Sequence, residues 1–273
     1  DNEYTQKFGK QQGKYYVPQR AAAGLDPWAT PQAYDNAKDF FDTGITWSNS
    51  LNVAQMLDKS SYSISLGNTH QDGIISSTGM DRYTVKVSAD TKLTNNWSSG
   101  FTANYITTSI DKAVTSGNGL LRTVYAAPPS YDLAGIPSHV DGNPYTQNSF
   151  RGSFDNAYWA MDNNKFTEDT NRFFGNVYAS YQTDFGTTNH KLNAKYMVGV
   201  DAYTTHYVDS YGYGSNTGGG RGQIENYGWT NATYNSLLTI NYDWRINEDW
   251  GLNAVLGNEI IQSNRKKYYE YGT

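Results

Sequence analysis

The chain has 273 residues, enough for one large domain or two small ones, and its net charge is -5. The 21 Lys and Arg residues are scattered rather than clustered, which argues against a nucleic-acid partner. Cysteine is absent, so neither a disulfide framework nor a thiolate metal site can form. Aromatic residues reach 15%, which argues against disorder. No stretch approaches the roughly 18 consecutive apolar residues of a membrane helix, so a helical membrane protein is excluded.

Residues 1–45 lack a regular hydrophobic period. They are polar and rich in Gln and Lys, contain Pro18, Pro27 and Pro31, and include a short segment with helical character at Ala33–Phe41. The N-terminus shows no basic segment followed by an apolar one, so a signal peptide is missing or has been left out. We predict that residues 1–45 are the end of a preceding domain and a connector.

From about residue 46 the sequence repeats one unit, a run of about 9 to 11 alternating residues followed by a turn. In the clearest run, Tyr83, Val85, Val87 and Ala89 alternate with Arg82, Thr84, Lys86 and Ser88. Successive side chains of a strand point to opposite sides, so this run has one apolar and one charged face. About eight such runs occur, each of the length that a tilted strand needs to cross a bilayer.

The connections between these runs differ in length. Those at 55–60, 91–95, 184–189 and 247–249 are short, whereas those at 71–80, 109–171 and 208–230 are longer. Short periplasmic turns and long extracellular loops are typical of outer-membrane barrels. Residues 46–273 are therefore predicted to form part of a barrel, with 109–171 and 208–230 as long extracellular loops.

Aromatic residues stand where these strands are expected to end. Beside the short turns lie Trp97, Tyr181, Trp244 and Trp250, and beside the long loops lie Tyr83, Tyr105, Phe173, Tyr203 and Tyr234. Amphipathic rings prefer the headgroup level of a membrane. The predicted fold class is all-β, a partial antiparallel transmembrane β-barrel of about eight strands. Its polar face, towards the lumen or the plug, carries Arg82, Lys86, Lys191, Lys195, Asp201, Asp243 and Glu259.

The sequence shows no arrangement for catalysis, so we do not expect an enzyme, a metal or a cofactor. The four histidines lack metal-ligand spacing, and no Gly-x-Ser-x-Gly motif occurs. The glycine-rich segment 212–222 lacks the Gly-Lys-Ser/Thr ending of a phosphate loop. The acidic segment 162–169 lacks the central Gly of a calcium loop.

The predicted long loops carry rings and cations suited to ligand binding, because rings offer rigid contact area with a polar tip. The candidates for substrate binding are Tyr125, Tyr145, Arg151, Tyr158, Trp159, Tyr211, Tyr213 and Arg221. The alternative is that these residues pack the loops against each other, since exposed rings gain from a partner that excludes water.

Several short segments together carry a family resemblance: Asp39–Gly44, Asn49–Ala54, Ser61–Gly67, Gln71–Ile75 and Asp81–Tyr83, with Asn143–Tyr145 and Asn171–Asn176 further along. They resemble the SusC/RagA type of TonB-linked outer-membrane transporter. The order of the first five is similar to the junction of plug and barrel in that family, which implies that residues 1–45 are the end of the plug domain and a connector. The resemblance implies a plug, a barrel of about 22 strands, a SusD-like surface lipoprotein, energy from TonB, and import of oligosaccharides or peptides across the bacterial outer membrane.

The sequence departs from the family pattern, since it shows no TonB box, no plug body, too few strands and no terminal aromatic strand. We therefore expect an internal fragment. Two alternatives remain open: a complete small barrel of about eight strands that acts as an anchor or adhesin, and a secreted carbohydrate-binding β-protein without a membrane role.

Overall fold

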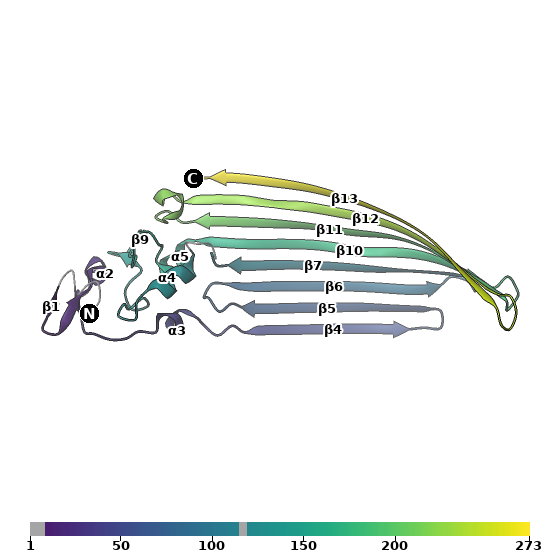
Figure 1. The fold of residues 1–273 in the computed structure, drawn as a ribbon, viewed down its shortest axis with the longest axis horizontal. Helices are drawn as coiled ribbons and strands as arrows, with labels where there is room; N and C mark the ends of the chain where they lie inside the picture. The colour runs from purple at the N-terminus through teal and green to yellow at the C-terminus, as the bar shows by residue number, and fades with distance from the viewer. Residues whose placement is uncertain (1–8, 115–118) are drawn as a thin grey trace.

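The computed structural model describes residues 9–114 and 119–273, which form one long curved sheet with a small helical cluster at one end (Figure 1). The sheet has eight antiparallel strands, as predicted, in the order β13-β12-β11-β10-β7-β6-β5-β4. The strands are β4 (Thr46–Met56), β5 (Ser60–Asp72), β6 (Gly79–Lys92), β7 (Trp97–Lys112), β10 (Lys165–Thr183), β11 (His190–Tyr211), β12 (Gln223–Arg245) and β13 (Gly251–Gly272).

The register of the sheet preserves the alternation seen in the sequence. Leu66 on β5 pairs with Val85 on β6, which pairs with Tyr105 on β7, and Tyr105 pairs with Phe173 on β10. Residues paired directly across antiparallel strands share a face, so the apolar sets of neighbouring strands join into one surface.

The strands at the C-terminal side are much longer than the 9 to 11 residues predicted. β11 and β12 pair without interruption from His190 and Trp244 to Tyr211 and Gln223. The expected loops 109–171 and 208–230 are thereby shortened to the connections 113–164 and 212–222. The added length was missed because these strand ends are polar on both faces, which removes the period-two signal, whereas the backbone ladder does not depend on polarity.

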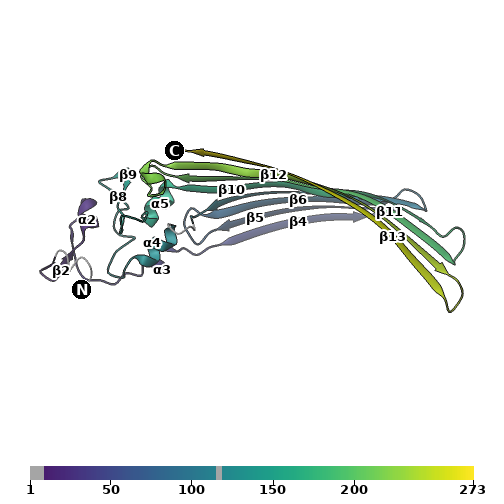
Figure 2. The ribbon, with the colours of Figure 1, turned by 45° about the horizontal axis from the view of Figure 1, so that its top comes forward.

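The remaining elements are short and lie near the end of the sheet that carries the longer connections (Figures 1 and 2). They are β1 (Lys10–Gln11), β2 (Lys14–Tyr16), α2 (Pro18–Ala22), β3 (Trp28–Ala29), α3 (Asn36–Phe40), α4 (Leu120–Ala126), β8 (His139–Val140), β9 (Asn143–Gln147), α5 (Ala157–Asn163) and the 3-10 turn η1 (Thr217–Gly220). Within the described ranges, no helix has the length and apolar character needed to cross a membrane.

Two segments distant in sequence, residues 9–41 and 119–164, fold together at this end, and we call them the cap. Among the described residues, every buried hydrophobic side chain except Phe166 belongs to the cap. Its core contains Tyr15, Val17, Phe40, Leu120, Val124, Ala127, Tyr131, Leu133, Ile136, Phe150, Ala157, Trp159 and Ala160. The only dry core of appreciable size in the described structure is therefore in the cap, beyond the strand ends.

Candidate functional site

One face of the sheet is an apolar surface without a protein covering. Large side chains on it stay open to solvent, with Leu51 58%, Val177 53% and Leu256 64% exposed. The register places further apolar side chains on the same face, which are exposed or half-exposed: Ile64, Leu66, Val85, Val87, Phe101, Val198, Leu238, Ile240 and Ile260. An exposed apolar surface of this extent marks contact with protein or membrane.

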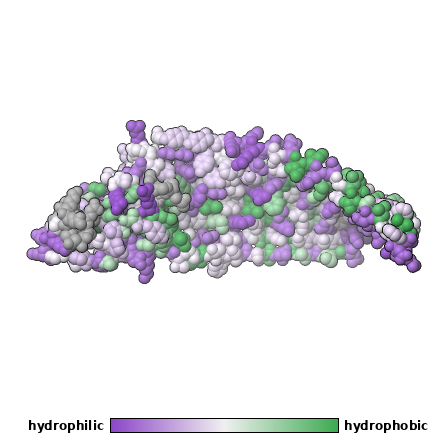
Figure 3. All heavy atoms as spheres, viewed as in Figure 1, coloured by the Kyte–Doolittle hydropathy of each residue, from purple (hydrophilic) through white to green (hydrophobic). Residues whose placement is uncertain are grey.

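This apolar band runs obliquely across the strands. Through the register, Ala89 on β6 lies level with Ile260 on β13. From that level the band extends toward the cap on β6, as far as Tyr83, and away from the cap on β13, as far as Leu252. In the view of Figure 3, hydrophobic side chains are denser toward the short turns than over the long strand ends beside the cap. A membrane plane crosses strands at a slant when they are tilted by roughly 35–45°, as in outer-membrane barrels.

Rings are found at both margins of the band. Trp97 and Tyr181 are paired across β7 and β10 at the short-turn end, with ring centroids 5.0 Å apart. Tyr105 pairs with Phe173 toward the cap end, and its hydroxyl donates to Asn171 Oδ1 at 3.0 Å. Tyr203, which was expected in the same girdle, is instead on the opposite face, because it pairs with Arg172. The prediction for Tyr203 was wrong, because a shift of one residue along a strand moves a side chain to the other face.

The opposite face of the sheet is polar and carries paired charges. Arg172 Nε and Nη2 donate to the two carboxylate oxygens of Asp201 at 2.8 and 2.6 Å. The hydroxyl of Tyr178 donates to Asp90 at 2.6 Å, and Lys195 Nζ stands 4.1 Å from the centroid of the Tyr178 ring. The register puts the other predicted lumenal residues Arg82, Lys86, Lys191, Asp243 and Glu259 on this same face.

Beyond the apolar band, the polar face of β11 to β13 holds an aromatic ladder that the sequence reading did not identify. Tyr207 and Tyr227 stack with centroids 5.0 Å apart and planes at 9°, and Trp229 lies 5.3 Å from Tyr207. Lys112 Nζ covers Tyr207 at 4.5 Å, and the Arg265 guanidinium covers Trp229 at 4.7 Å. Burial, followed by the nearby carboxylate of Asp209, raises the pKa of Tyr227 to about 12.

Three of the candidate binding residues lie open at the cap end. Tyr125 is 68% exposed on α4, with its ring 6.2 Å from that of Phe41. Tyr145 on β9 and Tyr213 in the connection 212–222 are 58% and 62% exposed, and their rings meet edge to face at 5.8 Å. The fold therefore brings Tyr145 and Tyr213 together from positions far apart in the sequence.

The other candidates differ in how open they are. Arg151 and Arg221 are exposed, and the Arg151 guanidinium lies 5.5 Å from the Phe150 ring. Tyr211 is half-buried at the end of β11, with its ring 5.1 Å from that of Phe166. Of the eight candidates, Tyr145 and Tyr213 form an exposed pair, whereas Trp159 is buried, so the eight residues do not form one open cluster.

Tyr158 and Trp159 on α5 serve the packing of the cap. Tyr158 donates to the carbonyl oxygen of Asp39 at 3.2 Å, and burial raises the pKa of its hydroxyl. Trp159 is fully buried, and its indole N–H donates to the carbonyl oxygen of Pro144 at 2.7 Å. Trp159 therefore packs the loops against each other, as the alternative interpretation has it, and no face of its ring remains open to a ligand.

A buried carboxylate joins the cap to the connection 212–222. Asp155 accepts from Ser215 Oγ at 2.6 Å, from the Asn216 backbone N–H at 2.7 Å, and from Gln147 Nε2 at 2.8 Å. Gln147 Nε2 also donates to the carbonyl oxygen of Gly214 at 2.8 Å. These bonds hold Tyr213 beside Tyr145. The sequence offered no signal for Asp155, because its partners Ser215 and Asn216 are about 60 residues away along the chain.

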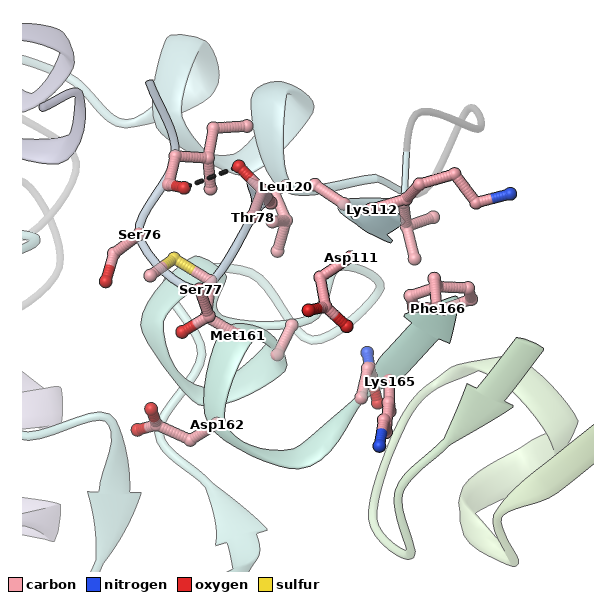
Figure 4. Close-up of a pocket in the computed structure, with 15 residues that line it drawn as sticks. Ser76, Ser77, Thr78, Asp111, Lys112, Leu120, Met161, Asp162, Lys165 and Phe166 are labelled. Atoms are coloured by element: carbon pink, nitrogen blue, oxygen red, sulfur yellow. Dashed lines mark hydrogen bonds between the residues drawn. The ribbon is translucent and has the colours of Figure 1, made fainter. Parts of the chain in front are cut away.

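A cavity of about 330 Å³ opens where the turn 73–78, the end of β7, α5 and the start of β10 meet (Figure 4). Asp111 and Lys165 both line it, whereas the side chain of Lys112 points away from it. Its apolar side is formed by Leu120, Met161 and Phe166. The described residues contain no group of three or more His, Cys, Asp or Glu that could hold a metal ion.

No protein-family model and no curated protein matches the chain. Solved structures do match. The RagAB peptide importer in the "closed-closed" state is 17% identical with a TM-score of 0.70, over 88% of this chain and 27% of that one. The "open-open" state of the same importer is 17% identical with a TM-score of 0.70, over 89% of this chain and 27% of that one. A structure of the RagAB peptide transporter is 15% identical with a TM-score of 0.68, over 88% of this chain and 27% of that one.

The chain therefore has the fold of about a quarter of a chain in this importer. The predicted resemblance to the SusC/RagA type is thereby confirmed at the level of the fold. The predicted fold class, a partial antiparallel β-barrel, is confirmed as well. These three structures are described as a peptide importer or peptide transporter.

Proposed function

We propose that this chain is part of the barrel wall of a TonB-dependent outer-membrane importer of the SusC/RagA type. The observation that carries the proposal is the uncovered apolar band, because it is backed by a polar face and its margins carry rings. Water is a poor solvent for such a surface, and hydrocarbon is the solvent in which strands of this alternation are stable. The lipid of the bacterial outer membrane is the proposed partner of the band.

The paired charges of the opposite face would then line the lumen, where they meet water or a plug. A bidentate Arg172–Asp201 pair and the cations Arg82 and Lys86 would be costly against lipid. The proposed assembly includes a SusD-like surface lipoprotein and TonB, which the family resemblance implies. The transported substrate would be an oligosaccharide or a peptide.

The open edges of the sheet bear on the two alternative functions. β4 pairs with β5 alone and β13 with β12 alone in the described structure, so the eight strands form an open sheet and not a closed small barrel. An anchor or adhesin built as a complete small barrel would require β4 to pair with β13. A secreted sugar-binding protein would need a protein cover over the apolar band, and the cap does not supply one.

The experiment uses spin labels at two adjacent positions, Val85 and Lys86, in the complete parent protein reconstituted into vesicles. Val85 belongs to the apolar face and Lys86 to the polar face, so each serves as the control for the other. We expect the label at Val85 to be accessible to a lipid-soluble relaxant and the label at Lys86 to a water-soluble one. If the label at Val85 is not accessible from lipid, the proposal fails.

We further propose that Tyr145 and Tyr213 contact the substrate, with Tyr125, Arg151, Tyr211 and Arg221 as weaker candidates. Two exposed rings held edge to face present one open face each to a flat sugar ring or a peptide side chain. Replacing both Tyr145 and Tyr213 by Ala should weaken uptake or binding at least tenfold, whereas replacing Tyr158 by Phe should not.

A further inference from the structure

The direction of β4 decides on which side of the wall the preceding residues lie. Thr46, at the start of β4, pairs with Gln71, which stands at the end of β5 next to the turn 73–78. Met56, at the other end of β4, pairs with Ser61 beside the turn 57–59. The chain therefore enters the sheet at the cap end and runs toward the short turns.

The two ends of the sheet differ in their connections. At the far end, the turns 57–59, 93–96, 184–189 and 246–250 contain three to six residues each. At the cap end, the connections are 73–78, 113–164 and 212–222, and the second of these spans a folded segment with two helices. In outer-membrane barrels the short turns are periplasmic and the long loops extracellular.

Residues 9–41 are fixed to one of those long connections. The Tyr15 hydroxyl donates to the Ser130 carbonyl at 2.6 Å, and the Leu133 N–H donates to Asn36 Oδ1 at 3.1 Å. Asn148 Nδ2 donates to the Gln19 carbonyl at 2.7 Å. Tyr15, Val17 and Phe40 are buried in the same core as residues of 119–164. Buried side chains and paired backbone groups make these two segments one folded unit.

We infer that residues 9–45 lie on the extracellular side of the membrane, as part of an outer cap shared with residues 119–164. This inference rests on the proposed function, since the membrane defines the sides. It gives residues 9–45 a different place from the plug and connector predicted from the sequence, because the segment lies beyond the strand ends and packs on a loop (Figures 1 and 2). The surface that meets an arriving ligand then includes residues 9–41.

The test is single-cysteine labelling of the complete parent protein in intact cells, for which the absence of cysteine in this chain is convenient. The test variant is Ala21→Cys, at an exposed position of α2. Gly152→Cys is the extracellular control, since a Cβ at Gly152 meets open space. Asn95→Cys, in the exposed turn 93–96, is the periplasmic control.

We expect a membrane-impermeant maleimide to label Ala21→Cys and Gly152→Cys in intact cells, and Asn95→Cys only after the outer membrane is permeabilised. Protection of Ala21→Cys with labelling of Gly152→Cys would overturn the inference and leave the proposed function standing. Equal labelling of all three in intact cells would instead contradict the membrane wall itself. Labelling of Asn95→Cys alone would reverse the orientation and overturn the inference.

Discussion

Trp159 in the cap is fully buried, whereas Trp47 on β4 is 65% exposed, although both belong to the same polypeptide. In the cap, apolar side chains from two distant segments exclude water from a common core. In the sheet, the side chains of the apolar band are exposed or half-exposed, and no other part of the described chain covers them. The cap buries its apolar side chains away from water, as water-soluble domains do. The sheet instead presents its apolar side chains outward, which is stable where the surrounding solvent is itself apolar.

In the sheet, the largest expected effect comes from a charge placed on the apolar band. Val198→Arg should destabilise the membrane-inserted state by about 2–4 kcal/mol, because lipid cannot solvate the guanidinium. The matched control is Met197→Arg. Met197 is the residue next to Val198, and its side chain belongs to the polar face. The measurement is the folded fraction in vesicles as denaturant is raised. Equal losses in both variants would contradict the difference between the two faces.

In the cap, the expected effect is confined to the cap itself. Trp159→Ala should cost about 3–5 kcal/mol, since it removes a fully buried ring and the indole bond to Pro144. Hydrogen exchange should rise in residues 9–41 as well as 119–164, while the strands stay protected. Tyr125→Ala, at an exposed position of α4, is the control. If exchange rises only in 119–164, the two segments do not fold as one unit.

The smallest effect concerns the junction between the two regions. Asp155→Asn removes the charge from an acceptor of several hydrogen bonds and should cost about 1–3 kcal/mol. The expected readout is faster amide exchange at residues 212–222, with the cap core unchanged. Asp162→Asn, at an exposed position of α5, should leave these rates as they are. Unchanged exchange in Asp155→Asn would show that other contacts hold this connection.

The strands could be read from the sequence where lipid is the expected solvent, since alternation in Tyr83–Ala89 or Leu252–Ile260 records which face is apolar. The same strands were invisible beyond the band. Tyr207 on β11 stacks with Tyr227 and Trp229 on β12. The other face of these strand ends is also polar, so no hydrophobic period distinguishes them from loops.

The candidate site was readable only in part. Tyr145 and Tyr213 were named from their residue type, but their contact depends on Asp155, whose partners come from another loop. Trp159 was named on the same ground and is buried, because composition cannot separate a ring that packs from one that stays open.

The oblique course of the apolar band sets the strands at unequal heights. β11 to β13 continue past the band by roughly 10 residues, on the order of 30 Å along each strand, whereas β5 and β6 end soon after it. In the proposed barrel wall, the outer rim would consequently be stepped. The cap would stand on the side of the shorter strands, and the stacked rings of β11 and β12 on the side of the longer strands.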